Sequence, residues 1–283
     1  MTQENNTTHD EKAAFDKQAI DRIAHGLIPD FRRLQPCDWF YNNPWRRPYL
    51  VEWIIGRYFE FALSHLVGSS VLEIGSGLGH MTLEFSRHGY DVTGLELSPE
   101  SIAHAAQLAE NDPFNQSIGK VHYIQADFMD WEPTRQFDNV CFFGTLHHFA
   151  HLDLVLNKTK TLLNPGGMVI AVEPARDCFG VKEASLVLLV RTLLSGYDGW
   201  FEPIEIPNDA GQIQNKIDDI IWEYQNASEI KDKLQSPHDN ASNSKEMLAG
   251  LRERFTEVDI EQGLSFFYRI GGGIRSNDEE KTK

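Results

Sequence analysis

The chain lacks a long hydrophobic run, and its 283 residues include only three cysteines. No apolar stretch approaches the roughly 18 residues that a membrane-spanning helix needs, so we expect no membrane partner. The cysteines are odd in number and show no CxxC spacing, which argues against both a disulfide framework and a thiolate zinc site. The polar N-terminal segment MTQENNTTHDEK also lacks the apolar core of a signal peptide. These absences predict a soluble protein of the reducing cytoplasm.

Long clusters of lysine and arginine are absent as well, and the formal net charge is −16. Binding to nucleic acid or to an anionic membrane depends on clustered basic side chains that neutralise phosphates. We therefore expect no nucleic-acid partner. The oligomeric state is left open by the sequence.

Apolar segments alternate with helical patterns between residues 70 and 174, which is typical of a parallel sheet with crossover helices. Helices are expected to begin near Gly79, Pro99 and Leu152, and residues 164–167 (NPGG) are expected to form a turn. The five predicted strands are VLEIG, DVTGLEL, VHYIQAD, FDNVCFFG and GMVIAVE. Because these strands are almost wholly apolar, both faces of the sheet should be buried.

Helical patterns flank this alternating region. One face near the N-terminus carries Phe15, Ala19 and Ile23, and a strongly apolar helix is expected after Pro48. Three further helices are predicted beyond residue 174, in VKEASLVLLVRTLL, IQNKIDDIIWEYQ and NSKEMLAGLRERF. Two closing strands are then predicted in TEVDIEQ and LSFFYRI.

The fold class predicted is therefore α/β: a Rossmann-like, doubly wound, mostly parallel sheet of seven strands with a helical N-terminal extension and a helical insertion after the fifth strand. The predicted parts are an N-terminal extension or lid at 1–67, a core at 68–175 plus 254–273, and an insertion at 176–253 that caps the acceptor site.

The stretch VLEIGSGLG, residues 71–79, places Gly75, Gly77 and Gly79 at alternate positions after the first strand. A strand, a glycine loop and a helix N-terminus together form an anion site. A dinucleotide site has the spacing GxGxxG, but here the third glycine comes one position earlier and His80 follows it. The glycine spacing of the loop differs from the dinucleotide pattern, but it does not identify another ligand.

Two acidic residues accompany the loop. Glu73 lies within the first strand, where a carboxylate is unfavourable beside a pyrophosphate and favourable beside a cation. Glu96 ends the second strand, where its two oxygens can accept both hydroxyls of a ribose. Ribose recognition is common to nicotinamide dinucleotides and to other nucleoside cofactors, so Glu96 indicates a nucleoside without identifying it.

Several motifs follow one another along the chain: VLEIGSGLG, the acid in GLEL, QAD at 125–127, FDNV followed by GTLHHF, and LLNPGG. Together they resemble a class I S-adenosylmethionine-dependent methyltransferase over residues 68–175. The resemblance implies S-adenosyl-L-methionine as cofactor, with the loop under its methionyl part, one acid at the ribose and another at the adenine amino group. Carried over by position, the cofactor-binding residues are Glu73, Gly75, Ser76, Gly77, Gly79, Glu96, Leu97, Asp127, Phe128 and Gly144. Leu97 and Phe128 have an alternative interpretation as core residues that flank the site.

Methyl transfer is an in-line displacement on an activated carbon, so a base is needed only when the acceptor retains a proton. The segment GTLHHFAH enters the crevice after the fourth strand, which makes His147 and His148 candidates for a general base or an acceptor-orienting group. The alternative is that the pair serves packing and hydrogen bonding. Since no carboxylate stands beside the histidines in the sequence, no metal site is expected.

Acceptor choice is expected to depend on the N-terminal segment and the insertion, which can fold over the strand ends. Tyr41, Trp45 and Arg46, together with Arg47, lie in the irregular stretch WFYNNPWRRP and are candidates for closing over the methionyl carboxylate or an aromatic acceptor. An alternative is that the aromatics only anchor this loop.

The predicted function is methyl transfer to a small-molecule acceptor at an oxygen, nitrogen or carbon atom. Two alternatives are a noncatalytic sensor or partner subunit that binds the same cofactor, and a nicotinamide-dependent dehydrogenase on a similar fold.

Overall fold

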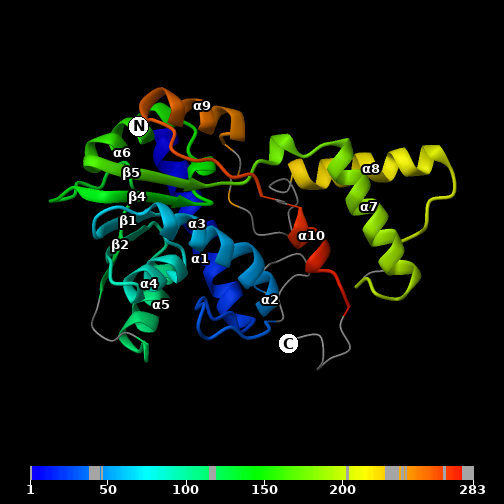
Figure 1. Ribbon diagram of the computed structural model, residues 1–283, viewed down its shortest axis with the longest axis horizontal. Coiled ribbons are helices and arrows are strands. Elements are labelled where there is room, and N and C mark those ends of the chain that lie inside the picture. The colour runs from blue at the N-terminus through cyan, green and yellow to red at the C-terminus, as the bar shows by residue number, and fades with distance from the viewer. Residues whose placement is uncertain are drawn as a thin grey trace.

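The computed structural model describes residues 2–37, 45, 47–114, 119–201, 204–226, 236, 239, 241–263 and 266–275, with the backbone alone for 2–9, 268 and 269. Its centre is a parallel five-stranded sheet in the order β3-β2-β1-β4-β5 (Figure 1). The strands are β1 (Ser70–Ile74), β2 (Asp91–Glu96), β3 (Lys120–Gln125), β4 (Phe137–Phe143) and β5 (Leu163–Val172). The Rossmann-like α/β prediction is thus confirmed for these strands.

The crossover helices are α4 (His80–Arg87), α5 (Pro99–Glu110) and α6 (Leu152–Leu162), which confirms the predicted starts. Ser98 caps α5 by accepting from Ser101 N–H, and Pro99 pre-sets the first helical turn. β1 pairs with both β2 and β4, so the strand order reverses beside β1. In open α/β sheets, the carboxyl ends of the strands at such a reversal form the ligand crevice.

Both faces of the sheet are covered by apolar side chains. On one face, Val71 and Val92 join a buried cluster with Phe85 of α4 and Phe59 of α3 (Arg57–His65). On the other face, a second cluster includes Leu72, Val140, Leu156 of α6 and Met247 of α9 (Ser244–Arg254). Burial on both faces explains why the strands are nearly continuous apolar runs.

The prediction of two closing strands was wrong, and the described residues contain five strands in place of seven. TEVDIEQ has no regular structure, and its Val258 and Ile260 are 64% and 46% exposed. Most of LSFFYRI falls in α10 (Phe267–Gly271), where Phe267 stacks on Trp53 at 5.5 Å between ring centroids. The alternating pattern was present, but Phe267 of the second segment packs on Trp53 in place of strand pairing.

The predicted turn at residues 164–167 lies inside β5. Pairing moves from Phe137↔Leu163 to Asn139↔Met168 across it, so the extra residues form an irregularity in the strand. Gly166 has a φ of 80°, a conformation that glycine adopts readily. The β4–β5 pairing therefore continues past the turn.

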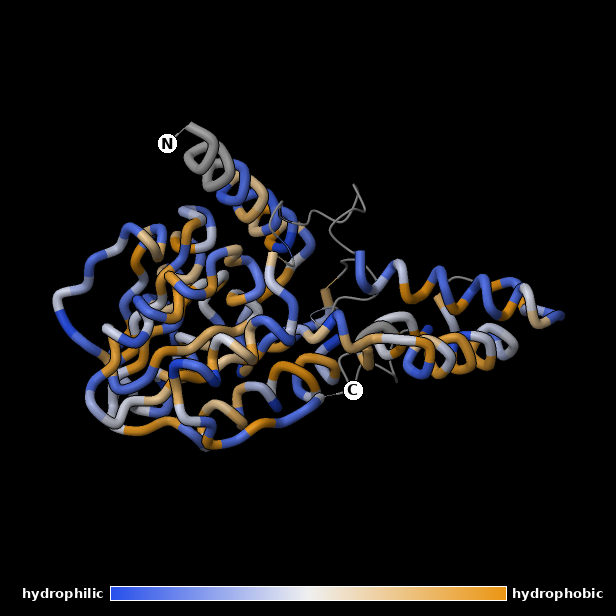
Figure 2. The backbone as a smooth tube through the Cα atoms, turned by 90° about the horizontal axis from the view of Figure 1, so that it is seen from above, coloured by the Kyte–Doolittle hydropathy of each residue, from blue (hydrophilic) through white to orange (hydrophobic). Residues whose placement is uncertain are grey.

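The predicted flanking helices are present. The N-terminal part contains α1 (Thr2–Ala24), α2 (Pro48–Leu50) and the π-helical η2 (Val51–Gly56) before α3. The segment after β5 contains α7 (Val181–Gly196) and α8 (Ala210–Gln225), which extend away from the α/β core (Figures 1 and 2). Short 3-10 turns, η3 (Leu146–His148) and η4 (Arg176–Cys178), follow β4 and β5. Among the helices that the structure describes, none combines the length and apolar character that a membrane crossing requires.

Arg87 of α4 ties the N-terminal segment to the core. Its side chain is 1% exposed, and its guanidinium lies 2.8 Å from Asp30, 2.9 Å from Glu84 and 2.7 Å from Asp112. A buried cation with several carboxylate partners is well satisfied, whereas each carboxylate alone would be poorly solvated. The cluster holds residue 30 and the end of α5 against α4.

Candidate active site

The loop after β1 is built on left-handed backbone conformations. Gly75, Gly77 and Gly79 have φ values of 72°, 54° and 83°. A Cβ on Gly75 would lie 2.4 Å from the Thr145 side chain, and one on Gly79 would lie 2.7 Å from the Cβ of Ala105. A Cβ on Gly77 would meet nothing within 4 Å. Two of the glycines therefore serve close packing, and the middle one faces open space.

Glu96 at the end of β2 holds this loop. Its Oε2 accepts from Gly77 N–H at 2.9 Å, and its Oε1 accepts from Ser98 N–H at 2.9 Å. Burial raises the pKa of Glu96, and these backbone N–H groups oppose that rise. Leu97 follows it and is half-buried. The carboxylate thus lies at the expected position beside the loop.

Glu73 is buried and accepts a hydrogen bond from the hydroxyl of Thr82 in α4. Burial raises its pKa to about 8. The side chain braces β1 against α4 and does not belong to the wall of the cavity beside Gly77. These contacts give Glu73 a role in the local packing of β1 and α4.

Two further loop positions fit a bound group. Ser76 is 1% exposed, and its hydroxyl has no hydrogen-bond partner among the described residues. Gly144, directly after β4, has a φ of 64° with no atom within 4 Å of an added Cβ. An orphaned buried hydroxyl and open space at both Gly77 and Gly144 suit a ligand that lies across the carboxyl ends of β1 and β4.

Asp127 and Phe128, predicted at the adenine, follow β3. Asp127 Oδ1 accepts from Met129 N–H at 2.8 Å, which caps the turn. Phe128 is 4% exposed within the core cluster, and its ring lies edge-on to Phe149 at 6.1 Å. The burial of Phe128 agrees with its alternative interpretation as a core residue, and Asp127 has a local structural role in the turn.

Helix α1 lies against the glycine loop and forms the opposite wall of a cavity. Its contributions are Phe15, Gln18, Ala19 and Arg22, which face Gly77, Leu78, Glu96 and Ser101. Asp16 accepts from the Ser98 hydroxyl at 2.6 Å, which fastens α1 to the turn after β2. Ile23, predicted on the same face as Phe15, is 37% exposed; Arg22 takes its place.

His147 is buried between two carboxylates. Its Nδ1 lies 2.7 Å from Oε2 of Glu173, and its Nε2 lies 3.2 Å from Oδ1 of Asp239. Burial alone lowers the pKa of His147, but the bonds to Asp239 and Glu173 outweigh this effect and raise it. In its protonated form, both nitrogens of the imidazole can donate to these two carboxylates.

Glu173, which the sequence analysis did not include, also organises the backbone after β4. Its Oε1 accepts from Thr145 N–H at 2.9 Å and from Leu146 N–H at 2.8 Å. A signal was available, because Glu173 is the last residue of the predicted fifth strand GMVIAVE, and neighbouring parallel strands end at the same edge of the sheet. No carboxylate stands beside the histidines in the sequence, but the fold brings Glu173 and Asp239 to His147.

His148 faces a different neighbourhood. Its Nδ1 lies 3.0 Å from the Ser236 hydroxyl, and its ring makes an edge contact with Phe15 of α1 at 5.4 Å. This histidine thus connects the turn after β4 with the wall that α1 provides. Ser236 and Asp239 come from the segment between α8 and α9, so the chain beyond α8 also reaches the site.

The nitrogen and oxygen atoms of His147, His148 and Asp239 lie within 4.8 Å of one another, close enough to be considered for a metal ion. Both nitrogens of His147 are already bonded to carboxylates, and Arg176 Nη1 lies 2.8 Å from Oδ2 of Asp239. The ion pairs account for this cluster without a metal.

Trp45, a predicted acceptor residue, is 8% exposed, and its ring packs against His80 at 5.0 Å. Its carbonyl accepts from Cys37 Sγ at 3.0 Å. These contacts agree with an anchoring role for the aromatic loop. Tyr41 and Arg46 lie outside the described residues.

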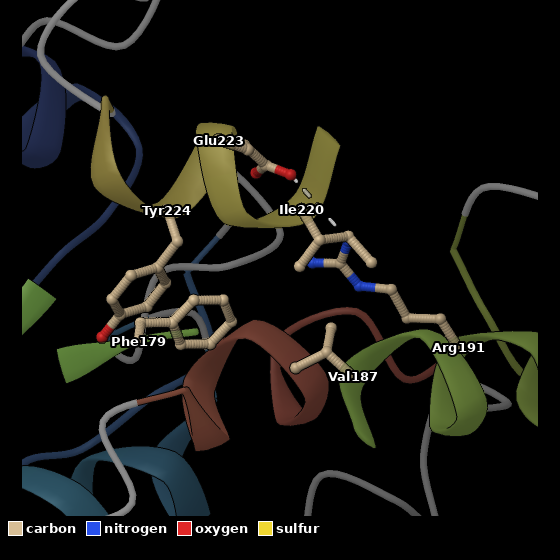
Figure 3. Close-up of a pocket in the computed structure, with 6 residues that line it drawn as sticks. All are labelled: Phe179, Val187, Arg191, Ile220, Glu223 and Tyr224. Carbon is tan, nitrogen blue, oxygen red and sulfur yellow. Dashed lines mark ion pairs between the residues drawn. The ribbon is translucent and has the colours of Figure 1, made fainter. Parts of the chain in front are cut away.

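A second pocket lies at the base of the α7–α8 pair. Figure 3 shows Phe179 facing Tyr224, with ring centroids 4.0 Å apart, and Glu223 directed at Arg191 at 3.9 Å. Val187 and Ile220 complete its lining. The lining is apolar apart from this ion pair, and the contacts join the insertion helices to each other.

The region that contains β1–β5 and the glycine loop matches a known protein family. The model of a family described as a methyltransferase domain matches residues 47–229. The ubiquinone biosynthesis O-methyltransferase of Psychrobacter cryohalolentis is 26% identical over 166 residues, which are 57% of this chain and 64% of that protein. The protein of the same name from Nitrobacter winogradskyi is 29% identical over 143 residues, 49% of this chain and 52% of that protein.

The matched regions thus span about half to two thirds of the length of these relatives. Among solved structures, the DhpI–SAH complex aligns with a TM-score of 0.43 at 23% identity, over 59% of this chain and 69% of that chain. A score at that level says nothing about the site.

Proposed function

The chain belongs to the methyltransferase domain family, and on that premise we propose that it transfers a methyl group from S-adenosylmethionine to a hydroxyl oxygen of a small-molecule acceptor. The observation that supports cofactor binding best is the pairing of Glu96 with the N–H of Gly77, next to open space above that glycine. When bound, the cofactor supplies a methyl carbon that its sulfonium group has already activated.

In this proposal, Glu96 accepts the ribose hydroxyls, while Ser76, Gly77 and Gly144 surround the methionyl part. A charged carboxylate is a strong acceptor for paired hydroxyl donors. Asp127 is assigned to the adenine amino group through its second oxygen, since Oδ1 is used by Met129 N–H. Glu73, Gly75 and Gly79 shape the loop from beneath.

The histidines divide into two roles. His147, bonded to Glu173 and Asp239, is a positioning residue that fixes the turn after β4. His148, in contact with α1 through Phe15, is the candidate that receives the acceptor's proton or orients its hydroxyl. Alignment of the acceptor with the methyl carbon and exclusion of water are the remaining tasks of the chain.

Oxygen is proposed as the acceptor atom because both curated relatives are named O-methyltransferases. A hydroxyl acceptor keeps its proton near neutral pH, so it benefits from a nearby imidazole, whereas an unprotonated amine does not need one. The histidine pair after β4 therefore suits an oxygen acceptor.

A label-transfer screen tests the proposal. Methyl-labelled S-adenosylmethionine is incubated with the protein and matched sets of phenols, aliphatic alcohols and amines, and labelled products are identified by mass spectrometry. Label on a hydroxyl oxygen supports the proposal, and label confined to nitrogen or carbon contradicts the choice of atom. Binding of the cofactor without turnover of any acceptor or metabolite extract would favour a noncatalytic sensor. Tight NADH binding without S-adenosylmethionine binding would favour a dehydrogenase.

A further inference from the structure

Arg22 enters the cofactor cavity from a part of the chain that precedes the matched family region. It lies in the last turn of α1 and lines the cavity together with Gly77 and Glu96. Phe15, Gln18, Ala19 and Arg22 are spaced i, i+3, i+4 and i+7, which places them on one helical face. Among the described residues that line this cavity, Arg22 has the one basic side chain.

The guanidinium remains charged in this position. Burial lowers the pKa of Arg22 to about 10, while the charges of Asp21 and Glu96 act in the opposite direction. A group with that pKa is protonated at neutral pH. The wall opposite the glycine loop therefore presents a partly desolvated cation, for which an anionic partner is favourable.

The surroundings of Arg22 add to this positive character. His80, the first residue of α4, has a pKa lowered to about 3, chiefly by burial and next by the charge of Arg22. Gly77 and Leu78, which line the cavity with Arg22, directly precede the N-cap of α4 at Gly79. First-turn N–H groups at such a helix N-terminus point out of the helix and favour negative charge. A cation and a helix N-terminus belonging to separate elements thus act on the same region of the cavity.

The proposed cofactor carries one anionic group, the carboxylate of its methionyl part. Its ribose hydroxyls suit Glu96, and its sulfonium and ammonium groups are repelled by a guanidinium. We infer that Arg22 binds the methionyl carboxylate, an assignment that rests on the proposed function. The planar fork of an arginine matches both oxygens of a carboxylate.

This assignment differs from the sequence-based expectation, which placed Arg46 or Arg47 over the same group. Arg47 precedes α2 and is not part of the cavity wall, and Arg46 lies outside the described residues. With Arg22 in this role, α1 distinguishes the complete cofactor from nucleosides that lack the amino acid.

Two ligands that differ only in this part provide the test. S-adenosylhomocysteine has the amino acid carboxylate, and 5′-methylthioadenosine has the same nucleoside thioether without it. Calorimetric titration of both ligands is performed on the full chain and on its Arg22→Gln, Arg22→Lys and Lys17→Gln variants. Lys17 is the matched control, because it lies on the exposed side of the same helix.

For Arg22→Gln we expect the Kd of S-adenosylhomocysteine to rise about 10- to 100-fold and the Kd of methylthioadenosine to stay within about twofold. Arg22→Lys should show a smaller loss confined to S-adenosylhomocysteine, and Lys17→Gln should bind both ligands normally. Circular dichroism verifies folding, and the Lys variant carries the comparison if the Gln variant does not fold.

Equal losses for the two ligands, or an unchanged Kd for S-adenosylhomocysteine, would overturn the assignment of Arg22. A wild-type protein that binds neither ligand would instead contradict the proposed function. The failure of the inference and the failure of its premise therefore give different results.

Discussion

His147 and Glu173 are joined by a hydrogen bond of 2.7 Å between Nδ1 and Oε2, although 26 residues separate them in the chain. The same carboxylate accepts backbone N–H groups at Thr145 and Leu146. One side chain at the end of β5 thus sets the backbone and an imidazole orientation in the turn after β4. The turn is held by charge-assisted bonds, which are stronger than neutral ones.

Replacing Glu173 tests this arrangement. Glu173→Gln should lower kcat while leaving the Kd of S-adenosylhomocysteine within about twofold, because Glu173 orients the turn without lining the cofactor cavity. We also expect the free energy of unfolding to fall by about 1–3 kcal/mol, since a buried amide cannot accept from all of the present donors. Steady-state kinetics, calorimetry and urea unfolding measure the three quantities. Glu132→Gln, at a side chain that is 90% exposed, is the control, and an equal kcat decrease there would contradict the assignment.

His148→Ala separates catalysis from packing. Because His148 contacts Phe15 and Ser236 rather than the glycine loop, turnover should fall more than cofactor affinity. The kcat and the Kd of S-adenosylhomocysteine are compared with those of the wild type. An unaltered kcat would leave this histidine with a packing role only.

Glu96→Ala should weaken cofactor binding by about 1.5–3 kcal/mol through loss of charge-assisted hydrogen bonds. The carboxylate is 8% exposed at the edge of the cavity, so solvent cannot readily replace it. Calorimetry with S-adenosylhomocysteine measures the change. Glu100→Ala, at an exposed position in the first turn of α5, serves as the comparison. Equal affinities for the two variants would refute the ribose assignment.

Glu73 predicts a pH dependence of stability. Its pKa is raised by burial to about 8 in the folded protein, so its contribution is fully present below the unfolded value of about 4.3 and is lost as the pH rises through about 8. Glu73→Gln, which cannot ionise, should therefore gain stability relative to the wild type between pH 5.5 and pH 8.5. Urea unfolding at the two pH values measures the difference. A difference in the free energy of unfolding between Glu73→Gln and the wild type that does not change with pH would show that this carboxyl does not titrate as stated.

Arg87→Met leaves the carboxylates of Asp30, Glu84 and Asp112 without their shared cation. Breaking a buried ion pair by removing one partner typically lowers the free energy of unfolding by about 3–5 kcal/mol. Arg57→Met is the matched control, because that side chain is 72% exposed, and it should change stability by about 0.5 kcal/mol or less. Chemical denaturation measures the free energy of unfolding of both variants. Similar small changes in this free energy for the two variants would exclude a structural role for the buried cluster.

The central strands and crossover helices were predictable because each one carries its own local pattern. β1, β2 and β4 are buried over most of their length and carry apolar runs, and Ser98-Pro99 marks the start of α5 at the residue where the helix begins. The prediction of two closing strands failed because strand pairing does not depend on the local pattern alone. Alternation in TEVDIEQ describes a segment able to pair, but pairing also needs its backbone to lie in register along an edge strand, and local sequence contains no such information.

Within the site, residues next to the glycine loop were predictable by position, whereas those joined only in three dimensions were not. Asp239 reaches His147 across 92 residues, and nothing in its surrounding sequence indicates that contact. Arg22 was missed because the apolar residues of its helix were read as one stripe that ended at Ile23. The cavity wall includes the charged side chain of Arg22, and a periodic pattern of apolar residues does not predict where charged side chains lie.

The bond between Asp16 and Ser98 spans 82 positions, and this distance affects how the molecule is assembled. Isolated helices are marginal in water, so α1 gains most of its order from packing on partners that come later in the chain. Closing such a long loop carries an entropic cost that must be met before the contact is made. During synthesis, α1 therefore leaves the ribosome well before its partners and docks late, and the cavity becomes complete only after β2 and α5 have folded.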